Sequence, residues 1–133
     1  MVIRLKSGGR SGFTLLEMMI VMIIIGILLS IALPIYNRSL VRARESVLHN
    51  DLFELRKLIQ QYTLDKQKAP QSLDDLKPQY IKEIPKDPIT GEANWDAPVC
   101  DTLDSVDQQD PGICDVHSAS TAISTEGDAY STW

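Results

Sequence analysis

The sequence predicts an α+β protein in which one long N-terminal helix carries a small antiparallel sheet and loops on its outer half. Three observations support this fold. An apolar run follows a short basic segment, an amphipathic helical pattern continues from that run, and a polar, increasingly acidic remainder with turn signals completes the 133 residues. This length allows one small domain besides the apolar run.

The apolar run, residues 13–34, is predicted to cross a membrane. Met18 to Leu33 carry no charge. In the longer segment from Phe13 to Leu33, Glu17 is the only charged residue. At 1.5 Å per residue such a helix spans the roughly 30 Å of a bilayer core. The rest of the chain is too short to enclose a helix that is apolar on every side, and no A-x-A cleavage site follows the run.

Residues 1–12 form a basic leader that contains Arg4, Lys6 and Arg10 and no acidic residue. Positive charge holds this end in the cytoplasm, so we expect the chain beyond Pro34 to lie on the opposite side of the membrane. Glu17 is the unusual residue, because a carboxylate at membrane depth costs about 3 kcal/mol on insertion scales. A plain membrane anchor would leave both the leader and this carboxylate without a role.

The string G-F-T-L-L-E, Gly12 to Glu17, between a basic leader and an apolar helix resembles the class III signal of type IV pilins and of the pseudopilins of type II secretion. The resemblance implies a pilin-like fold, cleavage after Gly12 by a prepilin peptidase and N-methylation of Phe13. Cleavage would place a cationic amine about one helical turn from Glu17. In a filament, the amine of one subunit would pair with Glu17 of another, and this desolvated pair would fix their register.

Pro34 has no amide donor and clashes with the preceding turn, so we expect the helix to kink or melt locally there. In filaments of the related family, this region is where the helix stretches or unfolds.

Residues 35–133 are predicted to form the globular domain on the periplasmic side. An amphipathic helix ending near Leu64 starts this domain. Its apolar positions recur every three to four residues: Val47, Leu48, Leu52, Leu55, Ile59 and Tyr62. Its charged positions take the other faces: Arg42, Arg44, Glu45, Asp51, Glu54, Arg56 and Lys57.

Turn and cap signals follow the helix. Ser72 with Asp75 predicts a capping box at the start of a short helix. Asp87-Pro88 and Thr90-Gly91 predict a tight loop. Residues 93–99 are predicted to form a strand.

This stretch resembles the major pseudopilin of type II secretion. The shared features are Tyr62-x-x-Asp65, Tyr80-Ile81 and Ile84-Pro85-x-Asp87-Pro88. The family continues Asp-Pro-Trp-Gly, whereas this chain has Asp-Pro-Ile-Thr-Gly and places its aromatic residue at Trp95.

From Asp87 onward the chain has ten acidic residues and no lysine or arginine, which disfavours nucleic-acid binding. Without the leader the formal charge would be about −8. The resemblance implies a calcium-binding loop near the C-terminus, for which Asp115, Glu126 and Asp128 are the candidate ligands. Carboxylate oxygens suit calcium, but a solvated acidic loop explains the same residues.

Cys100 and Cys114 are the only cysteines, and a bridge between them would contribute about 3 kcal/mol in the chain-entropy model. Two free thiols or a metal-binding pair are the alternatives, although the spacing does not favour zinc.

An enzymatic function is not expected. Asp115, His117 and Ser118 are the residue types of a hydrolytic triad, but neighbours on a strand point to opposite faces. His49 is interpreted as a solvated residue on the charged side of the helix, and the chain contains no phosphate-binding or nucleotide-binding fingerprint.

The sequence therefore predicts a structural subunit, the major pseudopilin of a type II secretion system, anchored once in the bacterial inner membrane. Its expected partners are identical subunits, the prepilin peptidase, minor pseudopilins, the inner-membrane assembly platform and lipid. A type IV pilin for adhesion or motility is the alternative within the family. A membrane-anchored binding module that never polymerises is the alternative outside it.

Cleavage at Gly12–Phe13 predicts that protein extracted from membranes lacks its first twelve residues and carries one added methyl group. Intact mass spectrometry measures both changes. An assembled filament whose subunits still begin at Met1 would contradict the prediction.

Overall fold

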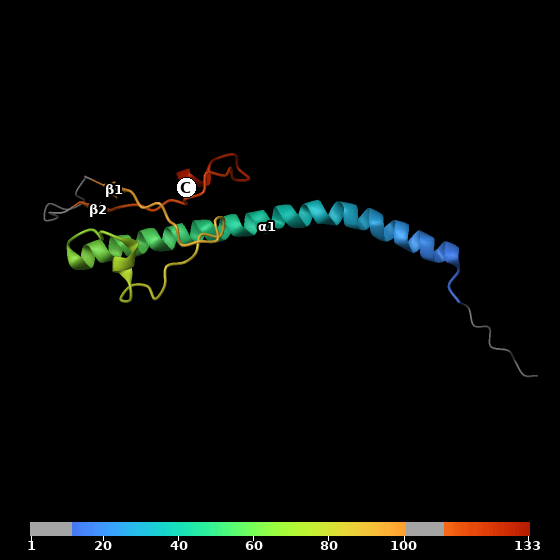
Figure 1. The fold of residues 1–133 in the computed structure, drawn as a ribbon, viewed down its shortest axis with the longest axis horizontal. Coiled ribbons are helices and arrows are strands. Elements are labelled where there is room, and N and C mark those ends of the chain that lie inside the picture. The colour runs from blue at the N-terminus through green and yellow to red at the C-terminus, as the bar shows by residue number, and fades with distance from the viewer. Residues whose placement is uncertain (1–11, 101–110) are drawn as a thin grey trace, which may run out of the picture. The chain divides into compact units, whose positions relative to one another are not determined.

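The computed structural model describes residues 12–100 and 111–133 and divides into two compact units, Met1–Arg38 and Ser39–Trp133 (Figure 1). One helix, α1 (Leu15–Lys66), contributes to both units. Except for Gly12, the expected leader lies outside the described residues.

In the first unit, α1 begins at Leu15, two residues after the proposed cleavage site. The side-chain oxygen of Thr14 accepts a hydrogen bond of 3.2 Å from the backbone nitrogen of Glu17, which caps the first turn. The helix assignment continues through Pro34, so the predicted local melting is not seen in this structure. A single proline removes one backbone hydrogen bond, and the flanking bonds of a long helix hold the remaining turns.

In the second unit, one stripe of α1 forms the core. Leu48, Leu52, Leu55 and Ile59 are almost completely buried, and their spacing of three to four residues places them on one face. Leu76, Trp95, Ile113, Val116 and Tyr130 pack against this stripe. Val47 was predicted to belong to it but is 50% exposed, because it lies one position before Leu48 and therefore faces away from the core.

The chain leaves α1 and forms a short 3₁₀ helix, η1 (Leu73–Leu76), with the predicted capping box. The Ser72 hydroxyl oxygen accepts a hydrogen bond from the nitrogen of Asp74 at 3.2 Å, and the Asp75 carboxylate accepts one from the nitrogen of Ser72 at 3.0 Å. These bonds satisfy amide groups that a helix start leaves unpaired. They hold Leu76 in the core, where it is completely buried.

The predicted tight loop is present, and the buried carboxylate of Asp87 organises it. This side chain accepts a hydrogen bond of 2.7 Å from the nitrogen of Ile89 and another from the hydroxyl of Ser118. Gly91 donates its amide to the Asp87 carbonyl at 2.8 Å and has a φ of 78°, a conformation that favours glycine. Asp87 was predicted to lie in this loop, but its complete burial was not predicted.

The predicted small antiparallel sheet is confirmed in the described residues as one pair of short strands. Strands β1 (Val99–Cys100) and β2 (Gly112–Ile113) pair antiparallel, with Val99 opposite Ile113. The predicted strand from Ala93 to Val99 is wrong over most of its length. Asp96 pairs with His117 only in an isolated bridge, and Pro98 has no amide to donate to a ladder.

β2 is attached to the chain beyond α1. The nitrogen of Ile113 donates to the Pro70 carbonyl at 2.8 Å, and a β-carbon at Gly112 would lie 2.6 Å from that of Ala69. This close approach requires glycine at position 112. A last 3₁₀ turn, η2 (Tyr130–Thr132), brings Tyr130 into the core.

The orange and red segments after residue 96 lie along one side of the green part of α1, and the lime and yellow segments from residue 66 lie on another (Figure 1). All of them depend on the same buried stripe of the helix.

Replacing Leu52, which is 1% exposed, by alanine should lower the free energy of unfolding by about 2–5 kcal/mol, because it leaves a cavity in this stripe. Tryptophan fluorescence during denaturant unfolding reports the change, since Trp95 and Trp133 both belong to the second unit. The neighbouring Phe53 is 70% exposed and is the matched control, for which alanine should change stability by less than about 0.5 kcal/mol. Equal losses in the two variants would contradict the assigned helix face.

Candidate functional site

The first candidate site is the start of the chain that the structure describes. Gly12, Phe13 and Thr14 precede α1 and are exposed, so the Gly12–Phe13 bond lies in accessible, non-helical backbone. Glu17 follows in the first turn of the helix, four residues after Phe13. The N-terminal end of a helix carries partial positive charge, which favours a carboxylate at this position. Whether an amine of another subunit pairs with Glu17 stays a prediction.

The helix of the first unit has no apolar cover of its own. No residue from 12 to 44 is buried, and large apolar side chains such as Ile23 and Leu28 are more than half exposed. By length and composition, α1 can cross a membrane. Such a surface requires lipid or other protein subunits around it.

The second candidate site holds the C-terminal segment on α1. Glu45 is only 6% exposed, and its carboxylate accepts hydrogen bonds from the nitrogen of Thr125 at 2.7 Å and from the hydroxyl of Tyr130 at 2.9 Å. The Thr125 hydroxyl donates a third hydrogen bond at 2.5 Å. Burial raises the pKa of Glu45, but the hydrogen bonds from Thr125 and Tyr130 and the charge of Arg42 outweigh it, so this pKa lies below its ordinary value of 4.5.

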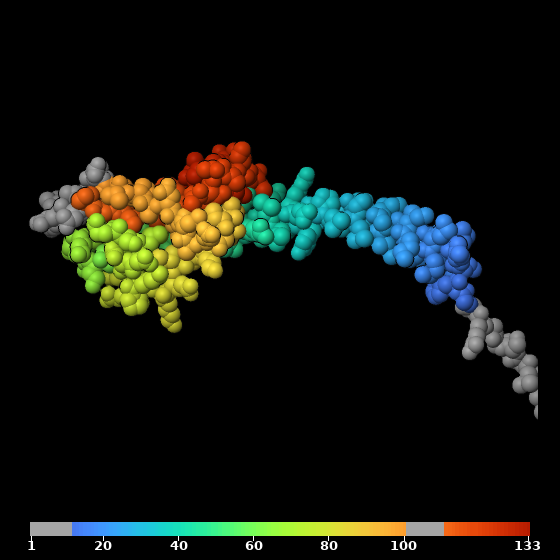
Figure 2. Space-filling view, viewed as in Figure 1, coloured from blue at the N-terminus to red at the C-terminus, as the bar shows by residue number. Residues whose placement is uncertain are grey.

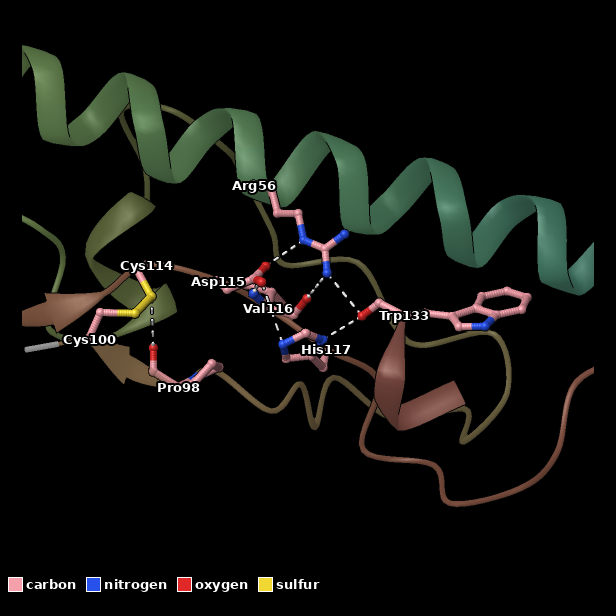
Figure 3. Close-up of polar contacts among 8 residues, drawn as sticks. All are labelled: Arg56, Pro98, Cys100, Cys114, Asp115, Val116, His117 and Trp133. Carbon is pink, nitrogen blue, oxygen red and sulfur yellow. Dashed lines mark hydrogen bonds and ion pairs between the residues drawn. A yellow bond between two sulfur atoms is a disulfide. The ribbon is translucent and has the colours of Figure 1, made fainter. Parts of the chain in front are cut away.

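Arg56 forms the next anchor, eleven residues further along the helix (Figure 3). Its Nε lies 2.5 Å from Asp115 Oδ1, and its terminal nitrogen donates to the carbonyls of Val116 and Trp133 at 2.9 Å each. Burial raises the pKa of Asp115, but hydrogen bonds from the Val116 amide and from Arg56 outweigh it and hold this pKa below its ordinary value. One guanidinium therefore fastens two separate segments to the helix.

An aromatic contact completes the attachment. The His49 ring stacks on Trp133 with ring centroids 4.0 Å apart, and Tyr130 meets Trp133 edge to face at 5.2 Å. The interpretation of His49 as a merely solvated residue was therefore incomplete. An open groove of 330 Å³ borders this contact, and it is lined by Arg42, Glu45, Ser46, His49, Thr125, Glu126 and Trp133.

Sequence reasoning missed the roles of Glu45 and Arg56 by placing both on the solvated faces of the helix. For Glu45 a signal existed, because it precedes Leu48 by three residues and Leu52 by seven and so continues the buried stripe. For Arg56 no such signal existed, because its partners come from residues 115–133 and are set only by the fold.

The three proposed calcium ligands are not brought together. Asp115 is paired with Arg56, whereas Glu126 and Asp128 are exposed in the loop after Ile123. Within residues 12–100 and 111–133, no three His, Cys, Asp or Glu side chains are grouped as a metal site would require. Four further acidic residues lie outside the described part of the chain: Asp101, Asp104, Asp107 and Asp110.

Cys100 and Cys114 lie at the ends of β1 and β2, with Cα atoms 5.8 Å apart and their sulfur atoms joined (Figure 3). This separation is the one that disulfides usually adopt.

The triad candidates lie after β2 rather than in a strand, and the structure separates Ser118 from the other two. His117 Nε2 lies 3.5 Å from Asp115 Oδ2, whereas the Ser118 hydroxyl is buried and donates to Asp87. In the groove, the Ser46 hydroxyl donates to the Arg42 carbonyl at 3.1 Å rather than to His49. Neither serine is therefore placed as a nucleophile next to a histidine.

A helix that starts at a processing motif, an uncovered apolar first half and a small α+β unit held on the second half together define a pilin-like subunit. The prokaryotic N-terminal methylation motif matches residues 8–33. Type II secretion system core protein G of Aeromonas hydrophila is 35% identical over 96 residues, which cover 59% of this chain and 67% of that protein. The protein of the same name in Vibrio cholerae is 32% identical over 70% of this chain and 75% of its own length.

The chain therefore belongs to the family of type II secretion system core protein G, the major pseudopilins. A shorter match, 42% identical over 60 residues, covers 45% of this chain and 38% of a type IV major fimbrial protein of Dichelobacter nodosus. No solved structure gives a significant match.

Glu45 should make the stability of the second unit depend on acid. Since the folded-state pKa of Glu45 is lowered, its stabilising contribution is complete above the ordinary value of 4.5 and is lost as the pH falls through the folded-state pKa. Glu45→Gln should lower stability at neutral pH and flatten the decline of stability below about pH 5. Denaturant unfolding at a series of pH values, followed by tryptophan fluorescence, measures both effects.

The matched control is Glu83→Gln, which changes an exposed glutamate elsewhere in the second unit. This variant should keep the acid dependence of the parent. An unchanged decline in Glu45→Gln would show that the carboxylate does not hold the C-terminal segment.

Proposed function

We propose that this protein is the structural subunit of a type II secretion filament, which grows at the inner membrane and pushes substrates outward through the periplasm. The observation that supports this most strongly is the placement of Glu17, the only charge of an apolar segment, in the first capped turn after an accessible Gly12–Phe13 bond. A helix of this kind needs an apolar surrounding and a partner for its carboxylate, and both are available when copies pack side by side.

The pairing of Glu17 with the Phe13 amine of a neighbouring subunit would supply the register. Opposite charges that are desolvated together attract strongly only at short range and in good geometry. An axial displacement of one helix would separate the charges within an apolar surrounding, where an unpaired carboxylate is costly. Assembly would therefore select a single stagger between subunits.

The membrane arrangement follows from the same segment. We place the leader 1–12 in the cytoplasm, where a prepilin peptidase would remove it, and the globular unit in the periplasm. Minor pseudopilins and an inner-membrane assembly platform would be the other partners. Pro34 would lie near the outer end of the span, as a site where the helix can adjust.

The proposed location is oxidising, which favours the bridge between Cys100 and Cys114. The bridge would close the hairpin of β1 and β2, whose described ladder has only two residue pairs. A non-reduced digest of protein taken from the periplasm should contain the linked peptides, and free alkylation of both thiols would contradict this assignment.

A type IV pilin is the second candidate function, supported by the similarity to the fimbrial protein. That similarity extends over 60 residues, whereas the secretion relatives align over 96 and 109 residues. The longer alignments favour secretion.

Replacing Glu17 by alanine should leave membrane insertion intact and reduce filament formation sharply, because the variant removes an unfavourable charge from the apolar segment together with the proposed partner of the amine. Quantifying the protein in membranes and in sheared filaments separates these two effects.

Glu17→Gln is the matched variant, since it keeps the size of the side chain and removes only its charge, and it should fail like alanine. Glu17→Asp keeps the charge and should retain part of the assembly. Filaments at the level of the parent in Glu17→Gln would leave the charge pair without support.

A further inference from the structure

The second unit carries charges of opposite sign at two separate places, each beside an exposed aliphatic side chain. The first, which we name the lysine end, consists of Leu64, Lys66 and Lys68, where Leu64 is 72% exposed. The second, which we name the acidic loop, consists of Ile123, Glu126 and Asp128, where Ile123 is 70% exposed. An apolar centre with a charged rim is the usual composition of a protein interface.

The two patches lie at opposite ends of the unit along α1. Thr125, inside the acidic loop, is hydrogen-bonded to Glu45, so this loop lies at the level of Glu45. Leu64 comes nineteen residues later on the same helix, a distance of about 30 Å at 1.5 Å per residue. Figure 2 shows the red atoms beside the turquoise part of the helix, at the opposite side of the second unit from the lime-green atoms.

The fold does not use these charges internally. Among the described residues, Asp115 pairs with Arg56 and His117, and Asp74 pairs with Lys77. None of these ion pairs includes a residue of either patch. Near the lysine end, Asp65 accepts the Tyr80 hydroxyl at 3.0 Å. Near the acidic loop, Arg42 lines the same groove as Glu45 and Glu126. With Arg44, which precedes Glu45, and with Asp128, two positive and three negative groups leave this end with one net negative charge.

We propose that the lysine end of one copy of this chain binds the acidic loop of the next copy, so that subunits join end to end along their helices. The inference rests on the proposed filament function. It adds a contact with a different neighbour from the one that pairs at Glu17, because the Glu17 pairing displaces two helices by only about one turn. In the proposed membrane arrangement all copies point the same way, so the antiparallel two-fold dimer that would also pair these patches cannot form. In parallel copies the two patches lie about 30 Å apart along the axis, and their contact is head to tail. It leaves one lysine end and one acidic loop free at every step, and therefore continues into a filament.

Charge reversal tests the pairing in the full chain, expressed with its assembly machinery. Lys66→Glu with Lys68→Glu, and separately Glu126→Lys with Asp128→Lys, should each reduce the sheared filament yield by about tenfold or more, because like charges then meet. The fourfold variant that combines both reversals should regain filaments. Lys82→Glu and Glu92→Lys change exposed charges outside both patches and are the matched controls.

Cysteine cross-linking tests the geometry independently of the charge. In Leu64→Cys combined with Ile123→Cys, the new thiols of one chain are about 30 Å apart, too far for a disulfide within that chain. Mild oxidation should therefore produce a ladder of covalent multimers on a non-reducing gel. Each single variant should produce no ladder beyond dimers.

The outcomes separate this inference from the proposed function. One result would overturn the end-to-end contact and leave the proposed filament function in place. In that result the parent forms filaments, the double cysteine variant gives no covalent multimers, and neither charge reversal lowers the filament yield. Absence of filaments in the parent, with its assembly machinery present, would overturn the proposed function. Tryptophan fluorescence unfolding of each variant verifies that a loss of filaments is not a loss of folding.

Discussion

The buried stripe of α1, from Leu48 to Ile59, is the surface on which the rest of the globular unit depends. In the described residues the strands pair over two residues each, and an isolated two-stranded hairpin is marginally stable at best. Leu76, Trp95, Ile113 and Val116 come from three different segments and meet on this one helix face. The hydrophobic contribution is therefore concentrated in a single contact surface, and each segment is ordered by its place on it.

Polar side chains of the same helix determine the positions at which the other segments bind to it. Glu45 is the first buried residue along α1, and it receives the C-terminal loop through three hydrogen bonds. Arg56 holds Asp115 and the carbonyl of Trp133. Buried or half-buried charges need specific partners at short range, so these two residues give positional precision that leucine contacts alone do not supply.

One helix thus has two kinds of surface along its length. Residues 12–44 have no buried member and require lipid or neighbouring copies, whereas the stripe that begins at Glu45 is covered by the chain itself. The proposed filament uses both kinds of surface. The apolar part would pack among identical helices, and the charge pair at Glu17 would fix their axial register. The covered part would present the lysine end and the acidic loop to other copies.

The amino-acid sequence by itself determined the features that depend on neighbouring residues. The processing motif at Gly12–Phe13, the apolar segment, the helix that follows it, the capping box at Ser72 and the turn at Asp87 are all set within a few positions, so local patterns predicted them. The family also followed from two local motifs. Only the tertiary structure decided which residues from distant parts of the chain meet.

The tertiary structure buried Glu45 and Asp87, directed Arg56 to residues 115–133 and stacked His49 on Trp133. It also reduced the predicted strand at 93–99 to an isolated bridge at Asp96 and the first residue of β1. Each of these outcomes depends on long-range contacts. A carboxylate is stable in a core only if donors such as Thr125 and Tyr130 arrive there, and a strand persists only if a partner offers hydrogen bonds along its length. Single-sequence periodicity contains no information on which partner arrives.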